Sequence, residues 1–215
     1  MPKQALIIGA TGLIGSHLSN LLAESDAFSK VVTLTRRAAP HASPKVENIV
    51  VDFERLQDHA AQFQTEVFFS CLGTTRRQAG SLAAQRTVDV DYQLQAAKLA
   101  AQGGAQHYLL VSSSGADANS RSAYLKMKGE LEQQVLQLPF PRISIFRPSL
   151  LLGERDHMRP AETFASWFLP LLCTLPGLRR YRPIQGAQVA EKMLQVSTTP
   201  GPARQGFTLD EIFPD

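Results

Sequence analysis

The chain begins with an apolar run that passes through three glycines into a helical pattern. Residues 4–10 (QALIIGA) are typical of a buried strand, and residues 13–25 (LIGSHLSNLLAES) have the apolar spacing of a helix. Gly9, Gly12 and Gly15 stand between them. Glycines here allow a tight turn and a close backbone approach to a pyrophosphate, which the helix N-terminus attracts. The stretch therefore predicts a dinucleotide-binding strand–turn–helix.

The same alternation of strands and helices continues along the chain. Apolar runs rich in β-branched or aromatic residues predict further strands at 30–36, 48–53, 66–73, 107–114 and 142–148. Amphipathic helices are expected at 88–104 and 122–138. This order implies right-handed crossovers and a parallel sheet covered on both faces. The expected fold is a doubly wound α/β sheet of Rossmann type.

The pattern becomes irregular after Gly153, where prolines interrupt short helical pieces. We expect one domain over residues 1–215, in which residues 154–215 form a small C-terminal lobe that acts as a substrate lid. Phe164, Trp167 and Phe168 form a stripe at near-helical spacing in this lobe. Core packing is its first interpretation, followed by a lid or a partner surface.

The composition argues against several other classes of protein. A chain of 215 residues with 44% hydrophobic and 19% charged residues is typical of a soluble globular domain, and a net charge of +3 is too small to predict nucleic-acid binding. Its apolar stretches are interrupted before membrane-spanning length, so no stable membrane insertion is expected. Cys71 and Cys173 are too few for a disulfide framework, and the histidines lack metal-ligand spacing. The residue spacing therefore predicts no bound metal. No signal peptide is recognisable, so a cytoplasmic location is expected.

The end of the second predicted strand indicates which dinucleotide is bound. An acidic residue there would bind the ribose hydroxyls of NAD, but this chain has Arg36 and Arg37. A guanidinium suits a 2′-phosphate and stacks on adenine. The sequence therefore favours NADP(H) over NAD(H), with an ordinary basic loop as the alternative.

The next two predicted strands end in further candidate cofactor contacts. Asp52 stands where a carboxylate could accept a hydrogen bond from the adenine amino group. Leu72, Gly73 and Thr74 end the fourth predicted strand and would place backbone against the adenosine ribose and the nicotinamide side. Cys71 precedes them and is either a redox thiol or, more commonly for such a position, a small buried hydrophobe.

Candidate catalytic residues follow the fifth predicted strand. Ser112, Ser113 and Ser114 end that strand, where ligands of open α/β sheets bind. Tyr124 and Lys128 lie four residues apart on the next predicted helix and so project from one face. A lysine ammonium one turn away favours the phenolate form of a tyrosine. Tyr124 could then exchange a proton with a carbonyl oxygen that a serine hydroxyl holds in place.

These motifs together resemble a known superfamily. GATGLIG, the strand-end serines and YLKMK resemble the short-chain dehydrogenase/reductases. More narrowly, CLGTTRRQAGS, VSSSGADANS, YLKMKGELE and FRPSLLLGER resemble the atypical branch that contains the Tat-interacting protein oxidoreductases. The resemblance extends from about residue 4 to about residue 165, and its motifs are specific in combination.

The resemblance implies a role for particular residues. Tyr124 and Lys128 would carry the active-site roles, with Lys128 also contacting the cofactor. Related branches place the active serine at the second or third position of such a run, so we expect Ser113 first and Ser114 second, and a structural role for Ser112. Pro148 to Leu151 would lie against the nicotinamide carboxamide. The dinucleotide site would be lined by Thr11, Gly12, Leu13, Ile14, Gly15, Arg36, Leu72, Gly73, Leu151 and Arg155.

The function expected from the sequence is NADP(H)-dependent hydride transfer to or from a small carbonyl or alcohol substrate. Two alternatives remain open. One is a cofactor-sensing regulator that acts through a protein partner with little turnover; the other is an epimerase or dehydratase that uses its cofactor transiently. The small C-terminal lobe argues against a large nucleotide-sugar substrate. A homodimer is compatible with the sequence.

Overall fold

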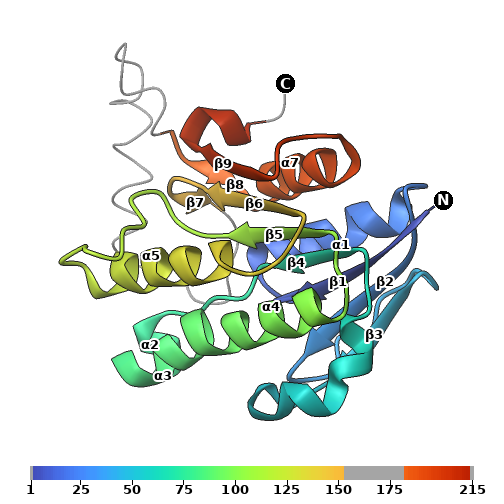
Figure 1. Ribbon diagram of the computed structural model, residues 1–215, viewed down its shortest axis with the longest axis horizontal. Helices are drawn as coiled ribbons and strands as arrows, with labels where there is room; N and C mark the ends of the chain where they lie inside the picture. The colour runs from blue at the N-terminus through green and yellow to red at the C-terminus, as the bar shows by residue number, and fades with distance from the viewer. Residues whose placement is uncertain (1, 153–181, 214–215) are drawn as a thin grey trace.

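The computed structural model describes residues 2–152 and 182–213, and it contains a central sheet with helices on both faces (Figure 1). The strands are β1 (Lys3–Ile8), β2 (Phe28–Thr35), β3 (Val46–Val50), β4 (Val67–Ser70), β5 (His107–Val111), β6 (Arg142–Arg147), β7 (Leu151–Leu152), β8 (Ile184–Gln185) and β9 (Arg204–Thr208). The α-helices are α1 (Leu13–Glu24), α2 (Arg76–Ala79), α3 (Leu82–Arg86), α4 (Tyr92–Gln102), α5 (Ala123–Leu136) and α7 (Gly186–Thr198). Three other helical segments are η1 (Phe53–Phe63), η2 (Thr87–Asp91) and η4 (Leu209–Ile212).

The main sheet is entirely parallel among the described residues. Its seven strands lie in the order β3-β2-β1-β4-β5-β6-β9. The chain moves outward in one direction from β1 to β3, then returns and moves outward in the other direction from β4. The strand order therefore reverses between β1 and β4, which is where open α/β sheets bind ligands at their carboxyl edge. The predicted Rossmann-type fold is confirmed.

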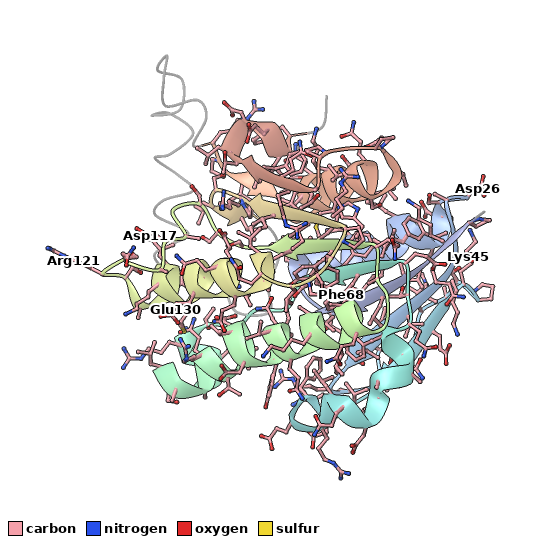
Figure 2. The ribbon with its side chains drawn as sticks, in the orientation of Figure 1. Asp26, Lys45, Phe68, Asp117, Arg121 and Glu130 are labelled. Carbon is pink, nitrogen blue, oxygen red and sulfur yellow. The ribbon has the colours of Figure 1, made fainter. Side chains whose placement is uncertain are left out.

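Successive residues of the strands bury their side chains in two separate cores. In β1, Leu6 and Ile8 face a core completed by α4, α5 and η1, while Ala5 and Ile7 face a core completed by α1 and α7. Phe68 of β4, which is labelled in Figure 2, belongs to the core on the α4 side of the sheet. A strand that is buried on both faces has no polar alternation, which explains why these strands appear in the sequence as continuous apolar runs.

Residues 182–213 are more regular than expected from the sequence. Helix α7 packs against α1, and β9 extends the main sheet beside β6. The apolar residues of α7 have helical spacing, so its signal was present and was missed. Strand β9 has one buried residue, Phe207, which leaves almost no pattern to detect. The boundary of a separate C-terminal lobe remains a prediction, because residues 153–181 lie outside the described part.

Candidate nucleotide and proton-transfer site

The turn after β1 needs glycine at its first position. Gly9 has φ +79°, and a Cβ built on it would lie 2.4 Å from the carbonyl carbon of Cys71, in the loop that follows β4. A side chain at this position would therefore force the ends of β1 and β4 apart. These strand ends flank the reversal of strand order. Gly9 therefore allows β1 and β4 to lie close together at the edge where a ligand is expected.

The N-terminus of α1 leaves its first backbone N–H groups free of a side-chain cap. Gly12 is the N-cap residue, and it has no side chain that could accept these hydrogen bonds. A Cβ on Gly15 would lie 2.2 Å from the carbonyl oxygen of Gly9, so the helix packs directly on the turn. Thr11 is exposed, Leu13 is half-buried and Ile14 is buried. Uncapped N–H groups at a helix N-terminus form a suitable site for a phosphate.

The arginines predicted to distinguish the two dinucleotides lie at the carboxyl end of β2. Arg36 and Arg37 are both exposed. The hydroxyl of Thr35 donates a hydrogen bond to the carbonyl oxygen of Arg37 at 2.7 Å, and Asn48 of β3 donates to the Thr35 hydroxyl at 2.9 Å. These contacts order the backbone of the loop and leave both guanidinium groups facing solvent.

Asp52 has a structural role that the sequence analysis missed. Its carboxylate caps η1 by accepting a hydrogen bond from the backbone N–H of Glu54 at 2.9 Å. Tyr92 of α4 lies nearby and donates to the Glu54 carboxylate at 3.4 Å. Burial raises the pKa of Tyr92, Glu54 and Asp52 raise it further, and Arg36 opposes them. The candidate adenine end of the site therefore contains Arg36 and these two carboxylates within electrostatic range of one phenol.

The loop after β4 lies between the glycine turn and η2. Leu72 is half-buried and Gly73 is exposed, while the backbone N–H of Thr74 donates to the Asp89 carboxylate at 3.0 Å. Cys71 packs against the core on the α1 side, and burial raises the pKa of its thiol to about 12. A thiol with so high a pKa is a poor nucleophile at neutral pH, which argues against a redox thiol here.

The three serines lie between the ends of β5 and β6. The backbone N–H of Ser112 donates to the carbonyl of Phe146 at 2.7 Å, and that of Ser114 donates to the carbonyl of Pro148 at 3.0 Å. The Oγ atom of Ser112 is buried and has no hydrogen-bond partner among the described residues. Ser113 and Ser114 are half-buried. The structure thus joins the serine loop directly to the segment predicted to lie beside the nicotinamide.

Tyr124 and Lys128 lie one turn apart at the start of α5 and differ sharply in exposure. Tyr124 is 39% exposed, whereas Lys128 is 4% exposed. The Nζ atom of Lys128 lies 3.8 Å from Oδ1 of Asp89, a residue of η2 that is fully buried. The expected tyrosine is therefore open to a ligand, while the lysine beside it is enclosed by protein.

Helix α5 also carries a second, partly buried ion pair, which was not predicted from the sequence. Glu132 stands one turn after Lys128 and binds Arg147, at the end of β6, through both carboxylate oxygens, with a shortest distance of 2.6 Å. Polar residues at a spacing of four on a helix face that packs on the sheet, such as Lys128 and Glu132, were the available signal. The pair fixes α5 to the strand that leads into Pro148.

The loop between the serines and α5 folds back on that helix. The backbone N–H of Asp117 donates to the carbonyl of Leu125 at 3.1 Å, and Figure 2 shows Asp117 and Arg121 along this loop and Glu130 on the helix. Leu151 lies in β7, which pairs with β8. Arg155 and the stripe of Phe164, Trp167 and Phe168 lie outside the described residues.

Within residues 2–152 and 182–213, no three His, Cys, Asp or Glu side chains gather in an arrangement that could hold a metal ion. None of the helices in this part of the chain combines the length and the apolar character needed to cross a membrane.

Comparison with known proteins identifies relatives along most of the chain. Protein HTATIP2 of Rattus norvegicus is 44% identical over 170 residues, which cover 77% of this chain and 70% of that protein. Protein FMP52, mitochondrial, of Saccharomyces cerevisiae is 41% identical over 182 residues, which cover 82% of this chain and 76% of the relative. The predicted resemblance to the Tat-interacting protein branch is confirmed.

Solved structures share the fold at low sequence identity. MoeE5 in complex with UDP-glucuronic acid and NAD matches with a TM-score of 0.74 and 18% identity over 96% of this chain and 76% of its own. The UDP-glucose 4-epimerase of Thermotoga maritima matches with a TM-score of 0.69 and 14% identity over 95% of this chain and 76% of its own. At these identities the likeness shows the fold alone.

The relatives correct one expectation. Fungal relatives from Eremothecium gossypii, Emericella nidulans and Saccharomyces cerevisiae are named as mitochondrial proteins, so the cytoplasmic location expected from the sequence is wrong. That expectation depended on a low cysteine count and on the lack of a recognisable signal peptide, and neither distinguishes the cytoplasm from a mitochondrial compartment.

A family model described as the NAD dependent epimerase/dehydratase family matches residues 5–170, which is most of the chain. This match agrees with the glycine turn, the strand order and the relatives at more than 40% identity. The protein belongs to the NAD dependent epimerase/dehydratase family of Rossmann-type NAD(P)-binding proteins.

Proposed function

We propose that the protein is an NADP(H)-dependent oxidoreductase that transfers hydride between the nicotinamide and a small carbonyl or alcohol substrate. The observation that carries this proposal is the exposed Tyr124, one turn from the enclosed Lys128, on a helix that follows the serine loop. That loop and the glycine turn after β1 both follow carboxyl ends of the same parallel sheet. The proposed dinucleotide site and the proposed proton donor would therefore share one edge of the sheet.

The residues of the described edge suit a dinucleotide. The turn from Gly9 to Gly15 brings backbone close to any ligand at the start of α1, whose N-terminal N–H groups have no side-chain cap. These groups would hold the pyrophosphate. Asp52, Leu72, Gly73 and Thr74 would line the adenosine and ribose side, and Pro148, Leu151 and Arg155 the nicotinamide side. When bound, the cofactor supplies or accepts the hydride.

The side chains of the protein would move and hold the proton. Tyr124 would donate its hydroxyl proton to the substrate oxygen as the carbonyl carbon is reduced, and would take the proton back in the oxidation direction. Lys128 would favour the phenolate form of Tyr124 through its positive charge. The hydroxyl of Ser113, or that of Ser114, would hold the substrate oxygen in place.

The preference for NADP(H) is supported by Arg36 and Arg37 at the end of β2. Both guanidinium groups are exposed at the position where an acidic residue would select NAD(H). A 2′-phosphate carries negative charge that two arginines would compensate.

A second function is favoured by the family match. An epimerase or dehydratase would oxidise its substrate transiently and return the hydride, using the same Tyr124 as the acid–base group. The names of the relatives support two further proposals, one about the location of the protein in the cell and one about a protein partner. The FMP52 proteins favour a mitochondrial location, and the relative named HTATIP2 favours a protein partner, which would act with or without turnover.

The test is to incubate the purified protein with NADPH and a panel of small aldehydes and ketones. The oxidoreductase proposal expects NADPH consumption that matches alcohol formation. Substrate conversion without net NADPH consumption would instead indicate the epimerase or dehydratase reaction. The regulator would be favoured if no substrate is converted and a partner protein binds this protein with only one of the two cofactor forms, NADPH or NADP.

A further inference from the structure

A fully buried carboxylate lies beside the candidate proton-transfer residues. Asp89 belongs to η2, a π-helical turn between α3 and α4, and its side chain has no exposure to solvent. Such turns are rare and widen a helix by one residue, often at functional sites. A buried carboxylate is costly unless it is paired and hydrogen-bonded, so the contacts of Asp89 require an explanation.

The carboxylate joins two separate parts of the site through one oxygen. Oδ1 of Asp89 accepts the backbone N–H of Thr74 at 3.0 Å and lies 3.8 Å from Nζ of Lys128. The other oxygen, Oδ2, accepts from Nε2 of Gln85 at 3.2 Å. Thr74 belongs to the proposed cofactor loop and Lys128 to the proposed proton-transfer helix. Asp89 therefore lies between two elements that the proposed reaction has to hold in register.

Further buried hydrogen bonds hold Asp89 itself in place. Its backbone carbonyl accepts from Nε2 of Gln93 at 2.9 Å, and Oε1 of Gln93 accepts from the hydroxyl of Ser70 at 2.8 Å. Ser70 is the last residue of β4, directly before the cofactor loop. All three residues are fully buried. A connected polar network of this kind fixes one side-chain arrangement, because any other would leave buried groups unpaired.

The ion pair of Asp89 and Lys128 is separate from the surface ion pair beside η2. On the packing elements, Arg86 of α3 pairs with Glu130 of α5 at the surface and is also close to Asp91. Tyr124 is the ionisable group one turn before Lys128 on α5. Among the described residues, Asp89 is the carboxylate with which Lys128 forms an ion pair. Enclosed charges in a medium of low dielectric interact more strongly than the same pair in water.

We infer that Asp89 is a positioning residue that anchors the Lys128 ammonium and the Thr74 backbone through the same carboxylate oxygen. This inference rests on the proposed function of Lys128. Because Asp89 is fully buried, it acts through Lys128 and Thr74 rather than directly. It compensates the charge of the enclosed lysine and fixes the distance between α5 and the loop after β4.

Two substitutions separate the two tasks of the carboxylate. Asp89→Asn keeps the size and one oxygen that can accept the Thr74 N–H, but it removes the charge that faces Lys128. Asp89→Ala removes both. Asp91→Asn is the matched control, because Asp91 is exposed in the same turn and is not part of the proposed site.

The first measurement is thermal unfolding, which requires no substrate. Asp89→Asn and Lys128→Met are each expected to lower the unfolding midpoint, because each leaves one buried charge without its partner. The fall in the unfolding midpoint of the double variant should be smaller than the sum of the falls in the two single variants. Additive losses, or an Asp89→Asn midpoint equal to that of Asp91→Asn, would overturn the inference.

The second measurement separates NADPH binding from turnover. Asp89→Ala is expected to weaken NADPH binding by about two- to tenfold, the equivalent of one lost hydrogen bond, while Asp89→Asn changes it by less than about twofold. Asp89→Asn should still lower kcat by about tenfold or more on any substrate that the wild-type protein converts. Equal NADPH affinities for both variants, or an unchanged kcat in Asp89→Asn, would contradict the two tasks.

The two proposals fail in different ways. If the wild-type protein converts no carbonyl, the proposed function fails while non-additive unfolding and the split in NADPH affinity still support Asp89. If the wild-type protein turns over and the unfolding losses add, the function stands and the role of Asp89 falls.

Discussion

A Cβ built on Gly15 would lie 2.2 Å from the carbonyl oxygen of Gly9, so the first turn of α1 rests directly on the turn that leaves β1. This contact involves backbone on both sides and cannot be relieved by rotating a side chain. We expect Gly15→Ala to lower the free energy of unfolding by about 1–3 kcal/mol and to weaken NADPH binding strongly. Thermal unfolding and fluorescence titration with NADPH measure the two effects. The neighbouring exposed substitution Ser16→Ala should leave both unchanged, and wild-type NADPH affinity in Gly15→Ala would contradict the assignment of the turn.

Tyr124→Phe tests the proton donor. Removal of the phenol hydroxyl should abolish turnover, since no proton can then reach the substrate oxygen from this position. NADPH affinity should stay within about threefold of wild type, because the ring and its packing remain. Steady-state rates and NADPH titrations give the two values. Surviving turnover would show that another group transfers the proton.

Lys128→Met tests the charge beside that tyrosine. The enclosed ammonium is expected to matter for turnover because it favours the phenolate form of Tyr124. Lys126→Met removes a lysine from the same helix at an exposed position and is the control. A large loss of kcat in Lys128→Met with little change in Lys126→Met is the expected result. Equal rates for the two variants would remove Lys128 from the proposed mechanism.

Arg36→Ala tests the choice of dinucleotide. The guanidinium is expected to bind the 2′-phosphate, which NADPH has and NADH lacks. The substitution should therefore weaken NADPH binding by about tenfold or more and change NADH binding little, as a lost charge-assisted hydrogen bond implies. Parallel titrations with both cofactors measure this. Equal affinities of the wild-type protein for NADPH and NADH would already exclude the preference.

His107 predicts a component of the pH dependence of stability. It is buried at the start of β5, and its ring lies 2.9 Å from the hydroxyl of Ser144. Burial, with smaller contributions from Arg142 and Lys3, lowers the pKa of His107 from 6.5 to about 3. Between these values the unfolded chain binds the proton and the folded chain does not. The free energy of unfolding should therefore fall as the pH falls through this range, by up to about 1.4 kcal/mol per pH unit from this residue.

His107→Gln provides the comparison for that prediction. Glutamine keeps a hydrogen-bonding group and cannot take up a proton, so the fall in stability between pH 6.5 and about 3 should be shallower than in the wild type. Urea unfolding at several pH values measures both slopes. Identical slopes would show that His107 does not contribute.

Some features of the site were predictable because their signals are local. The GATGLIG turn combines a strand, three glycines and a helix within a few residues, and the structure places it at the reversal of strand order. Tyr124 and Lys128 were placed on one helix from their spacing alone, which the structure bears out. Asp52 lies just beyond the end of β3 and caps η1, a role that the sequence did not reveal, while its contact with adenine stays a prediction.

Asp89 illustrates what local signals miss. In the sequence it is one acidic residue in a helical stretch that could equally face solvent. Its burial follows from contacts with Thr74, fifteen residues away, and with Lys128, which belongs to another helix. A π-helical turn also shifts which face the residue occupies, and the spacing of apolar residues does not reveal such a shift.

The sequence by itself determined the strands from β1 to β6 and the two long helices α4 and α5, together with the strand ends where we propose that ligands bind, because backbone preference and apolar periodicity act over short stretches. Only the tertiary structure decided which polar groups are buried together. Lys128 with Asp89, Glu132 with Arg147, and β9 beside β6 are pairings of distant segments. Their stability depends on desolvation and on the packing of the whole sheet, and neither can be read from any single stretch of the chain.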